Sequence, residues 1–154
     1  MIHAWRIVKT KYKNAAFNGE GAAFASGRWH EIKTPMVYCS DTLALAALEL
    51  FVHLQEESKL INFVSFEIHI PSDLIIKIEE ITTLPKKWRQ QPPGDATKKI
   101  GSLWHNSLKS TVLSVPSTII PNNRNYLLNP NHINFKKIKI NSPIPFSFDS
   151  RMWK

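Results

Sequence analysis

The stretch TLALAALELFVHLQ, residues 42–55, carries one acidic side chain, Glu49, within a mostly apolar pattern typical of a helix. In a helix, its neighbours three and four residues away are Leu45, Ala46, Val52 and His53. A carboxylate on such a face is unpaired and costly, paired with a cation, or held there for chemistry. The packing and the function of the chain therefore both depend on what surrounds Glu49.

The length and composition are those of one globular domain spanning residues 1–154. Hydrophobic residues make up 43% of the 154 residues and charged residues 21%, which suits a single apolar core. The start of the chain, MIHAWRIVKTKYK, lacks the apolar core of a signal peptide, and no apolar run approaches the roughly 18 residues that span a bilayer. We therefore expect a cytoplasmic protein without a membrane partner.

The cysteine and histidine content predicts no disulfide and no metal site. Cys39 is the only cysteine, so it cannot form an internal disulfide. No Cys/His group has the spacing of zinc ligands, and the histidines are scattered over positions 3, 30, 53, 69, 105 and 132.

The net charge of +8 indicates an anionic partner: a nucleic acid, a phosphate-bearing small molecule or an acidic protein. The cations are dispersed over residues 9–13, 86–89, 98–99 and 136–139, without a basic tail. A solvated surface rich in lysine explains this charge equally well.

Apolar and alternating patterns predict strands at residues 2–8, 36–39, 62–70, 74–78, 111–115 and 135–140. One helix is predicted from a cap at Ser40 or Asp41 to about residue 56, and a second from Asp95 or Thr97 to about residue 108. Residues 18–27, 84–94 and 119–131 are predicted as loops and turns. Many short strands with two helices, not in strict alternation, indicate an α+β fold.

Common nucleotide and esterase motifs are absent. Gly19 and Gly21 begin a dinucleotide fingerprint, but Phe24 occupies its third glycine position and no strand-to-helix turn follows. The chain has no P-loop lysine motif, and Ser117 lacks the flanking glycines of a hydrolase elbow. These routes to function are excluded.

Four polar residues in separate predicted elements remain as candidates: Arg28, Tyr38, Glu49 and Ser117. The guanidinium of Arg28 suits a phosphate or carboxylate, and Tyr38 offers an aromatic face with a hydroxyl. From the residues alone, however, a structural ion pair with a nearby glutamate (Glu20, Glu31 or Glu49) is the preferred explanation for Arg28. Likewise, Tyr38 suits a core residue with a satisfied hydroxyl, and Ser117 suits a turn.

The ordered series of motifs resembles the RES domain family, the toxins of RES–Xre toxin–antitoxin pairs. The resemblance covers nearly the whole chain through AWRIV, GEGAAFASGRWH, VYCS, LALAALELFVHL, LPKKW, IGSLW, LSVPSTIIP, NYLLNPNH and FSFDSRMW. It implies an ADP-ribosyltransferase-like fold, with a mixed β-sheet core and flanking helices. It also implies an enzyme that consumes NAD⁺ by hydrolysis, phosphorolysis or transfer of ADP-ribose to a protein.

The resemblance assigns catalytic roles to Arg28 of GRW, Tyr38 of VYCS, Glu49 of ALEL and Ser117 of VPS. Arg6 and Asn125 are further substrate-binding candidates, together with Arg28, Tyr38 and Ser117. Glu49 would stabilise the oxocarbenium character that develops at the ribose. Two departures from the family pattern concern loops: Ser26 replaces a second glycine before GRW, and Asn123–Arg124 replaces a more usual acidic residue.

The resemblance implies NAD⁺ as a substrate, with no bound cofactor and no metal. The implied partner is an Xre-like helix-turn-helix antitoxin that occludes the active site, so that nucleic acid is contacted only through the antitoxin; a homo-oligomer is left open. One alternative is an ADP-ribosyltransferase with a specific protein acceptor. Another is a basic nucleic-acid-binding module without catalysis, for which Trp5, Trp29, Trp88 and Trp104 could stack on bases.

Overall fold

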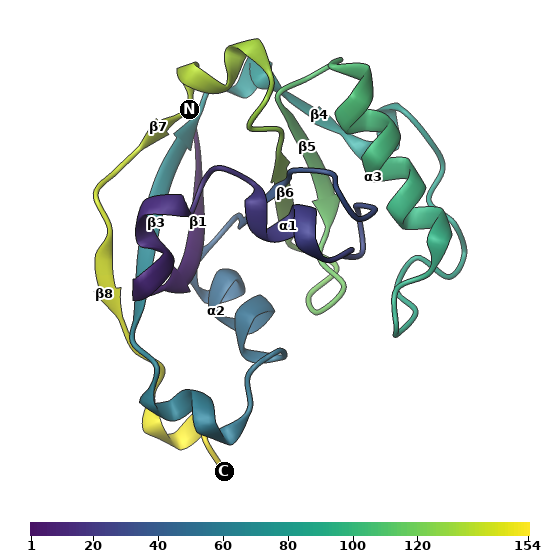
Figure 1. Cartoon of the computed structure of the whole chain (residues 1–154). Coiled ribbons are helices and arrows are strands. Elements are labelled where there is room, and N and C mark those ends of the chain that lie inside the picture. Colours follow the sequence, from purple (N-terminus) through teal and green to yellow (C-terminus); the bar gives the residue numbers. More distant parts are fainter.

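An eight-stranded mixed sheet organises the computed structural model, which describes residues 1–154 (Figure 1). The strands are β1 Ile2–Lys9, β2 Val37–Ser40, β3 Phe63–Ile70, β4 Ile75–Lys77, β5 Val112–Pro116, β6 Arg124–Leu128, β7 Lys139–Ile140 and β8 Ile144–Phe146. Their order is β4-β5-β6-β2-β1-β3-β7, and β8 also pairs with β3. Only the β4–β5 pair is parallel. The predicted α+β class with a mixed sheet is confirmed.

Three α-helices accompany the sheet: α1 Glu20–Phe24, α2 Leu43–Phe51 and α3 Asp95–Ser107. Helix α3 lies beside β4 and β5 at one end of the sheet, whereas β7 and β8 lie at the opposite edge (Figure 1). Helix α2 packs on β1 and β3, where Ala46 joins Ile7 and Phe63 in a buried apolar cluster. None of the helices is long and apolar enough to cross a membrane.

The centre of the sheet is buried on both faces. Along β5 and β6, consecutive residues alternate between two apolar clusters: Val112 and Leu128 belong to one, and Leu113 and Leu127 belong to the other. Because side chains alternate across a strand, these clusters occupy opposite faces. The second cluster contains Trp104 of α3, so this helix covers the face that also presents Tyr38. All five residues of β5 are buried, and Ser114 is the one polar residue among them.

Helix α2 begins later and ends earlier than predicted. Its cap is Thr42, whose hydroxyl accepts a hydrogen bond from the Leu45 N–H at 3.0 Å. Ser40 and Asp41 cannot serve, because the Ser40 hydroxyl bonds Asn125 and the Asp41 carboxylate accepts from the Arg124 N–H. The helix ends at Phe51 rather than near residue 56, where a separate 3₁₀ turn, Glu56–Leu60, begins.

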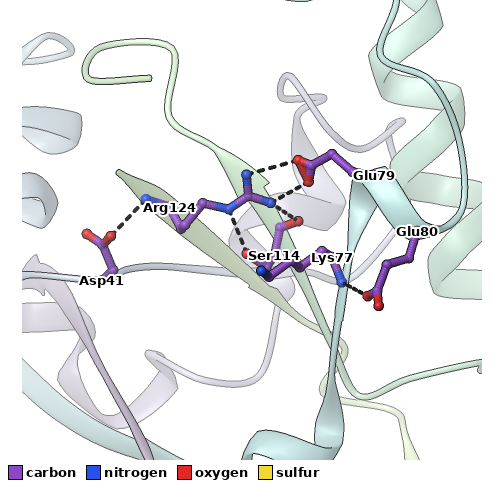
Figure 2. A network of polar contacts seen from close by, with 6 residues as sticks. All are labelled: Asp41, Lys77, Glu79, Glu80, Ser114 and Arg124. Carbon is purple, nitrogen blue, oxygen red and sulfur yellow. Dashed lines mark hydrogen bonds and ion pairs between the residues drawn. The ribbon is translucent and has the colours of Figure 1, made fainter. Parts of the chain in front are cut away.

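Strand β6 was missed, since residues 119–131 were predicted as turns. It pairs with both β2 and β5, and its first residue is held by a polar network (Figure 2). The Arg124 guanidinium donates to both Glu79 oxygens, at 2.7 and 3.0 Å, and to the hydroxyl and carbonyl oxygens of Ser114. Its backbone N–H donates to Asp41 at 2.8 Å. Apart from Asn125, which lies in β6, the asparagines and prolines that suggested turns flank this strand, and only these long-range contacts reveal it.

The remaining differences are local. The predicted loop at residues 18–27 contains the short helix α1, and the predicted strand at 135–140 is mostly a 3₁₀ turn, Ile133–Lys137, followed by the two residues of β7. The His132 side chain accepts from the Asn134 N–H at 3.1 Å and so favours this turn. The strand predicted at 74–78 shortens to β4, and Pro116 ends β5 as its last residue. The helix predicted from Asp95 is confirmed as α3, although its cap is Gly94.

Candidate active site

A cavity of about 1000 Å³ opens beside β2, β6 and α2. Its walls come from chain segments far apart in the sequence: residues 26–30, Tyr38 of β2, Glu49 of α2 with Val52 and His53 just after that helix, residues of the loop at 89–93, Pro116, Thr118 and Ile119, and Asn125 of β6. Arg28, Tyr38, Glu49 and Asn125 all line it. Tertiary structure therefore brings four of the six predicted site residues to one cavity of a size that suits a small-molecule ligand.

Glu49 is half-buried and is held by neutral donors, not by a cation. Its Oε1 accepts a hydrogen bond from the Ser117 hydroxyl at 2.7 Å and another from the Asn125 side-chain amide at 2.7 Å. The Asn125 carbonyl oxygen in turn accepts from the Ser40 hydroxyl at 2.8 Å, which fixes the orientation of the amide. Both bonds reach the same oxygen, so Oε2 has no donor from the protein. The carboxylate is anchored while one of its oxygens stays free for a ligand.

Ser117 lies behind Glu49 rather than in the cavity wall. It is fully buried, and its oxygen accepts from the backbone N–H groups of Ile119 and Ile120, both at 3.1 Å. Its single proton is donated to Glu49. The hydroxyl therefore stabilises the predicted turn and also orients the carboxylate of Glu49.

Arg28 makes no ion pair with Glu20, Glu31 or Glu49, so the structural explanation preferred from the sequence is wrong. Its Nη1 instead donates to the carbonyl oxygens of Trp88 and Gln90, at 2.8 and 2.9 Å. Nε and Nη2 have no acceptor in the protein. Partial burial lowers the pKa of Arg28, and the negative charge of Glu49 opposes this shift. Arg28 therefore presents a cationic, partly unsatisfied guanidinium to the cavity.

Tyr38 contacts a buried histidine that the sequence analysis did not single out. The hydroxyl of Tyr38 lies 2.5 Å from Nδ1 of His30, and Nε2 of His30 lies 2.7 Å from the Ala25 carbonyl oxygen. A carbonyl only accepts, so the proton of the neutral ring is on Nε2, and Tyr38 donates to Nδ1. Burial lowers the pKa of His30 and raises that of Tyr38, which keeps both groups neutral.

The GRW motif forms a tight loop that is closed by this histidine. Gly27 and His30 form an isolated bridge, with the Gly27 N–H donating to the His30 carbonyl at 3.1 Å. A Cβ atom at Gly27 would lie 2.6 Å from the His30 ring, so only glycine fits. The loop exposes Arg28 to the cavity and buries Trp29 in the core.

Arg6 supports the site from beneath. Its guanidinium donates to the carbonyl oxygens of Ala16, at 2.8 Å, and Tyr38, at 2.9 Å, and burial lowers its pKa. Arg6 borders a second, smaller cavity of about 220 Å³, which Glu49 and Asn125 also line. The two hydrogen bonds of Arg6 go to the protein backbone, so the structure places it as a brace for β2.

The family model described as the RES domain matches residues 3–149. The chain belongs to the RES domain family. The resemblance stated from the motifs is thereby confirmed.

RES-domain relatives match along almost their whole length. A protein of Photorhabdus laumondii named "Toxin Res" is 38% identical over 97% of this chain and 96% of its own. A Sphingobium protein named "Prs ADP-ribosylating toxin" is 35% identical over 96% of this chain and 94% of its own. A chain in the crystal structure of the M. tuberculosis MbcT–MbcA toxin–antitoxin complex superposes with a TM-score of 0.74, covering 94% of this chain and 84% of that one. At 13% identity, this likeness shows a shared fold.

Two residues of this RES domain escaped the sequence analysis although they line the cavity. Arg89 donates through Nε and Nη2 to the Thr118 carbonyl oxygen, at 3.1 and 2.6 Å, and adds a second guanidinium to the cavity. In the sequence, Arg89 is one of the dispersed cations at residues 86–89. His30 directly follows GRW, but nothing in the sequence indicates that its ring meets Tyr38.

Two of the tryptophans considered for base stacking are unavailable. Trp29 and Trp104 are each only 3% exposed and pack in the core beneath α3. Stacking on a nucleic-acid base needs an accessible ring face. This burial removes much of the support for a nucleic-acid-binding module.

Proposed function

We propose that this RES domain is a toxin that cleaves the bond between nicotinamide and ribose in NAD⁺. The observation that carries the proposal is the Glu49 carboxylate, anchored through Oε1 and free at Oε2, in a cavity that Arg28 also lines. The names of the relatives, "Toxin Res" and "Prs ADP-ribosylating toxin", support the toxin activity and the use of an ADP-ribose donor.

Glu49 lowers the barrier by interacting more strongly with the transition state than with the ground state. Positive charge develops on the ribose as the glycosidic bond breaks, and a preorganised carboxylate stabilises it. Ser117 and Asn125 keep the carboxylate in place, so little reorganisation is needed during the reaction. Nicotinamide leaves as a neutral molecule, so the leaving group needs no general acid.

Tyr38 is suited to orient the nicotinamide. Tyr38 lines the cavity, and because its proton is donated to His30, its hydroxyl oxygen acts toward other groups as a hydrogen-bond acceptor. The carboxamide N–H of nicotinamide is a matching donor, and the phenol ring offers a face for stacking. His30 thus determines which hydrogen-bonding role Tyr38 plays.

Arg28 and Arg89 are suited to hold the pyrophosphate. Arg28 keeps Nε and Nη2 without protein acceptors, and a guanidinium fork matches phosphate oxygens. Arg89 reaches the same cavity from the neighbouring loop. Part of the net positive charge of the chain therefore lies in this cavity, on two arginines suited to bind the substrate.

The acceptor of ADP-ribose determines the class of enzyme, and two outcomes follow from the same bond cleavage. Water or phosphate as acceptor makes the protein an NAD⁺ glycohydrolase or phosphorylase that depletes cellular NAD⁺. A protein side chain as acceptor makes it an ADP-ribosyltransferase, which the name of the Sphingobium relative favours. Both outcomes use the same site up to the departure of nicotinamide.

The proposal includes an antitoxin partner. The crystal structure of a toxin–antitoxin complex with the same fold supports such a partner for this chain. We place an Xre-like helix-turn-helix antitoxin over the cavity, with nucleic acid contacted through the antitoxin, and the toxin in the cytoplasm, where it meets NAD⁺. Expression of the RES chain alone should stop growth, and co-expression of the antitoxin should restore it. Normal growth with abundant folded toxin would count against the proposal.

The decisive experiment is incubation of purified protein with NAD⁺, with and without phosphate, followed by mass spectrometry of small molecules and protein. Free ADP-ribose, phosphorylated ADP-ribose and a protein adduct distinguish the three acceptors. Glu49→Gln should fold normally yet lose at least about 100-fold in turnover, comparable to the loss of one transition-state contact. Glu57→Gln, an exposed carboxylate in a 3₁₀ turn, is the matched control and should retain activity. Turnover by Glu49→Gln at the wild-type rate would exclude the proposed mechanism.

A further inference from the structure

Three metal-ligand side chains meet on β1 and β3, outside the cavity. His3 on β1 is directly opposite His69 on β3, and Glu67 precedes His69 by two residues, so all three side chains project from the same face of the sheet. His3 Nδ1 lies 2.9 Å from Glu67 Oε1, and His69 Nε2 lies 3.4 Å from the same oxygen. The two imidazole rings stack at a centroid distance of 4.2 Å. The three donor atoms all lie within 4.8 Å of one another.

We propose that His3, Glu67 and His69 form a binding site for Zn²⁺. A tetrahedral zinc ion with ligands at about 2.0–2.2 Å places its donor atoms roughly 3.3–3.6 Å apart. To reach this arrangement the two stacked imidazole rings must turn out of their stack, so that a nitrogen lone pair of each points at the ion. Two imidazoles and one carboxylate are a common zinc ligand set and leave the fourth position for water or another donor. Hard cations such as Mg²⁺ prefer an all-oxygen set and should bind poorly.

The surroundings allow an ion to enter. The side chains of His3, Glu67 and His69 are 49%, 37% and 23% exposed, so the donor atoms are reachable without opening the core. The charged residue facing the cluster from the next strand is Lys139, which pairs with His69 and is exposed. Its positive charge opposes a bound cation. The three ligands therefore favour Zn²⁺ binding, and the one neighbouring lysine weakens it.

The site would join two strands that adjoin the active-site region. Trp5, two residues after His3, lies 6.2 Å from the His3 ring and lines the smaller cavity that Glu49 also borders. Zinc would fasten the first strand of the chain to β3 and stabilise the folded state by mass action. The three ligands lie on β1 and β3 and take no part in the proposed reaction with NAD⁺.

The test is titration of the full chain, free of any histidine tag, with Zn²⁺ by isothermal titration calorimetry, accompanied by thermal unfolding. We expect one Zn²⁺ per chain and a rise in Tm of about 5–10 °C at a zinc concentration near 100 times Kd. Mg²⁺ should produce neither effect. Tetrahedral Co²⁺ absorption provides an independent signature of the ligand set.

Variants separate this cluster from adventitious histidine binding. His3→Gln and His69→Gln should each weaken Zn²⁺ binding by at least about tenfold, because each loses one ligand. Lys139→Glu should strengthen it by removing the opposing charge and adding a carboxylate. The control is His53→Gln, an exposed histidine outside the cluster, which should bind as the wild type does. Absence of saturable binding, or equal binding by the His3, His69 and His53 variants with Tm unchanged before metal is added, would overturn the proposal.

Discussion

Replacing Ser117 with alanine tests whether this residue positions Glu49 or contacts the substrate. The change removes one hydrogen bond to the carboxylate and leaves the N–H groups of Ile119 and Ile120 without their acceptor. A hydrogen bond to a charged group is worth roughly 1.5–3 kcal/mol. Ile120 is 39% exposed, so water can satisfy part of what is lost. We therefore expect the free energy of unfolding to fall by about 2–3 kcal/mol.

The activity of Ser117→Ala should change through kcat rather than KM. Asn125 still binds Oε1, so Glu49 remains in the cavity but with greater freedom to rotate. Displacement of a catalytic group by about 1 Å costs up to roughly 100-fold in rate, so kcat should fall about 10- to 100-fold. KM should stay close to wild type, because Ser117 is fully buried behind the carboxylate.

Steady-state NAD⁺ consumption and thermal unfolding measure the two effects separately. For a chain of this size, a loss of 2–3 kcal/mol should lower Tm by about 4–12 °C. Ser117→Thr keeps the hydroxyl and should recover part of kcat if the buried site accepts the extra methyl group. A raised KM with normal kcat would refute the positioning role and indicate substrate contact.

Three further changes test particular contacts. Burial lowers the pKa of His30 below its ordinary value, so the folded state binds this proton less readily than the unfolded state, and stability should decline as the pH falls below about 6.5. In urea unfolding at pH 5 and pH 7.5, His30→Gln should show a smaller decline than the wild type. An unchanged decline would contradict the assignment to His30. Trp153→Ala removes an aromatic contact with Phe51 of α2, at a centroid distance of 4.9 Å, and should cost about 1–2 kcal/mol in chemical denaturation, whereas Trp153→Phe should cost less. Gly101→Ala would place a Cβ atom 1.6 Å from the Trp29 carbonyl oxygen. The free energy of unfolding should therefore fall by about 3 kcal/mol or more, despite the better helix propensity of alanine. A Tm at or above that of the wild type would show that α3 moves freely.

The local pattern of apolar residues predicted secondary structure well where an element's own sequence determines its conformation. The alternation of residues 2–8 and 62–70 predicted β1 and β3 closely, and the apolar periodicity after residue 95 predicted α3. It was a poor guide for β6, whose strand depends on pairing with β2 and β5 and on the ion pair between Arg124 and Glu79. No local pattern carries that information.

The same division applies to the site. The lone carboxylate in an apolar helix indicated Glu49, and the motifs of the RES family indicated Arg28, Tyr38, Ser117 and Asn125. Which of them touch one another was decided by folding. The structure replaced an ion pair of Arg28 with backbone anchors and put Ser117 behind Glu49. It also paired Tyr38 with His30, which the sequence analysis had passed over.

By itself, the sequence indicated the family through the resemblance of its ordered motifs. It also determined the α+β class and the identity of the isolated acidic residue, because these follow from residue type and short-range periodicity. Tertiary structure alone decided that Ser117 and Asn125 share one oxygen of Glu49 and leave the other free, and that His3 meets Glu67 and His69. Hydrogen-bond and ligand geometry act over about 3 Å between residues that are tens of positions apart in the chain. Such distances arise only once the strands have paired.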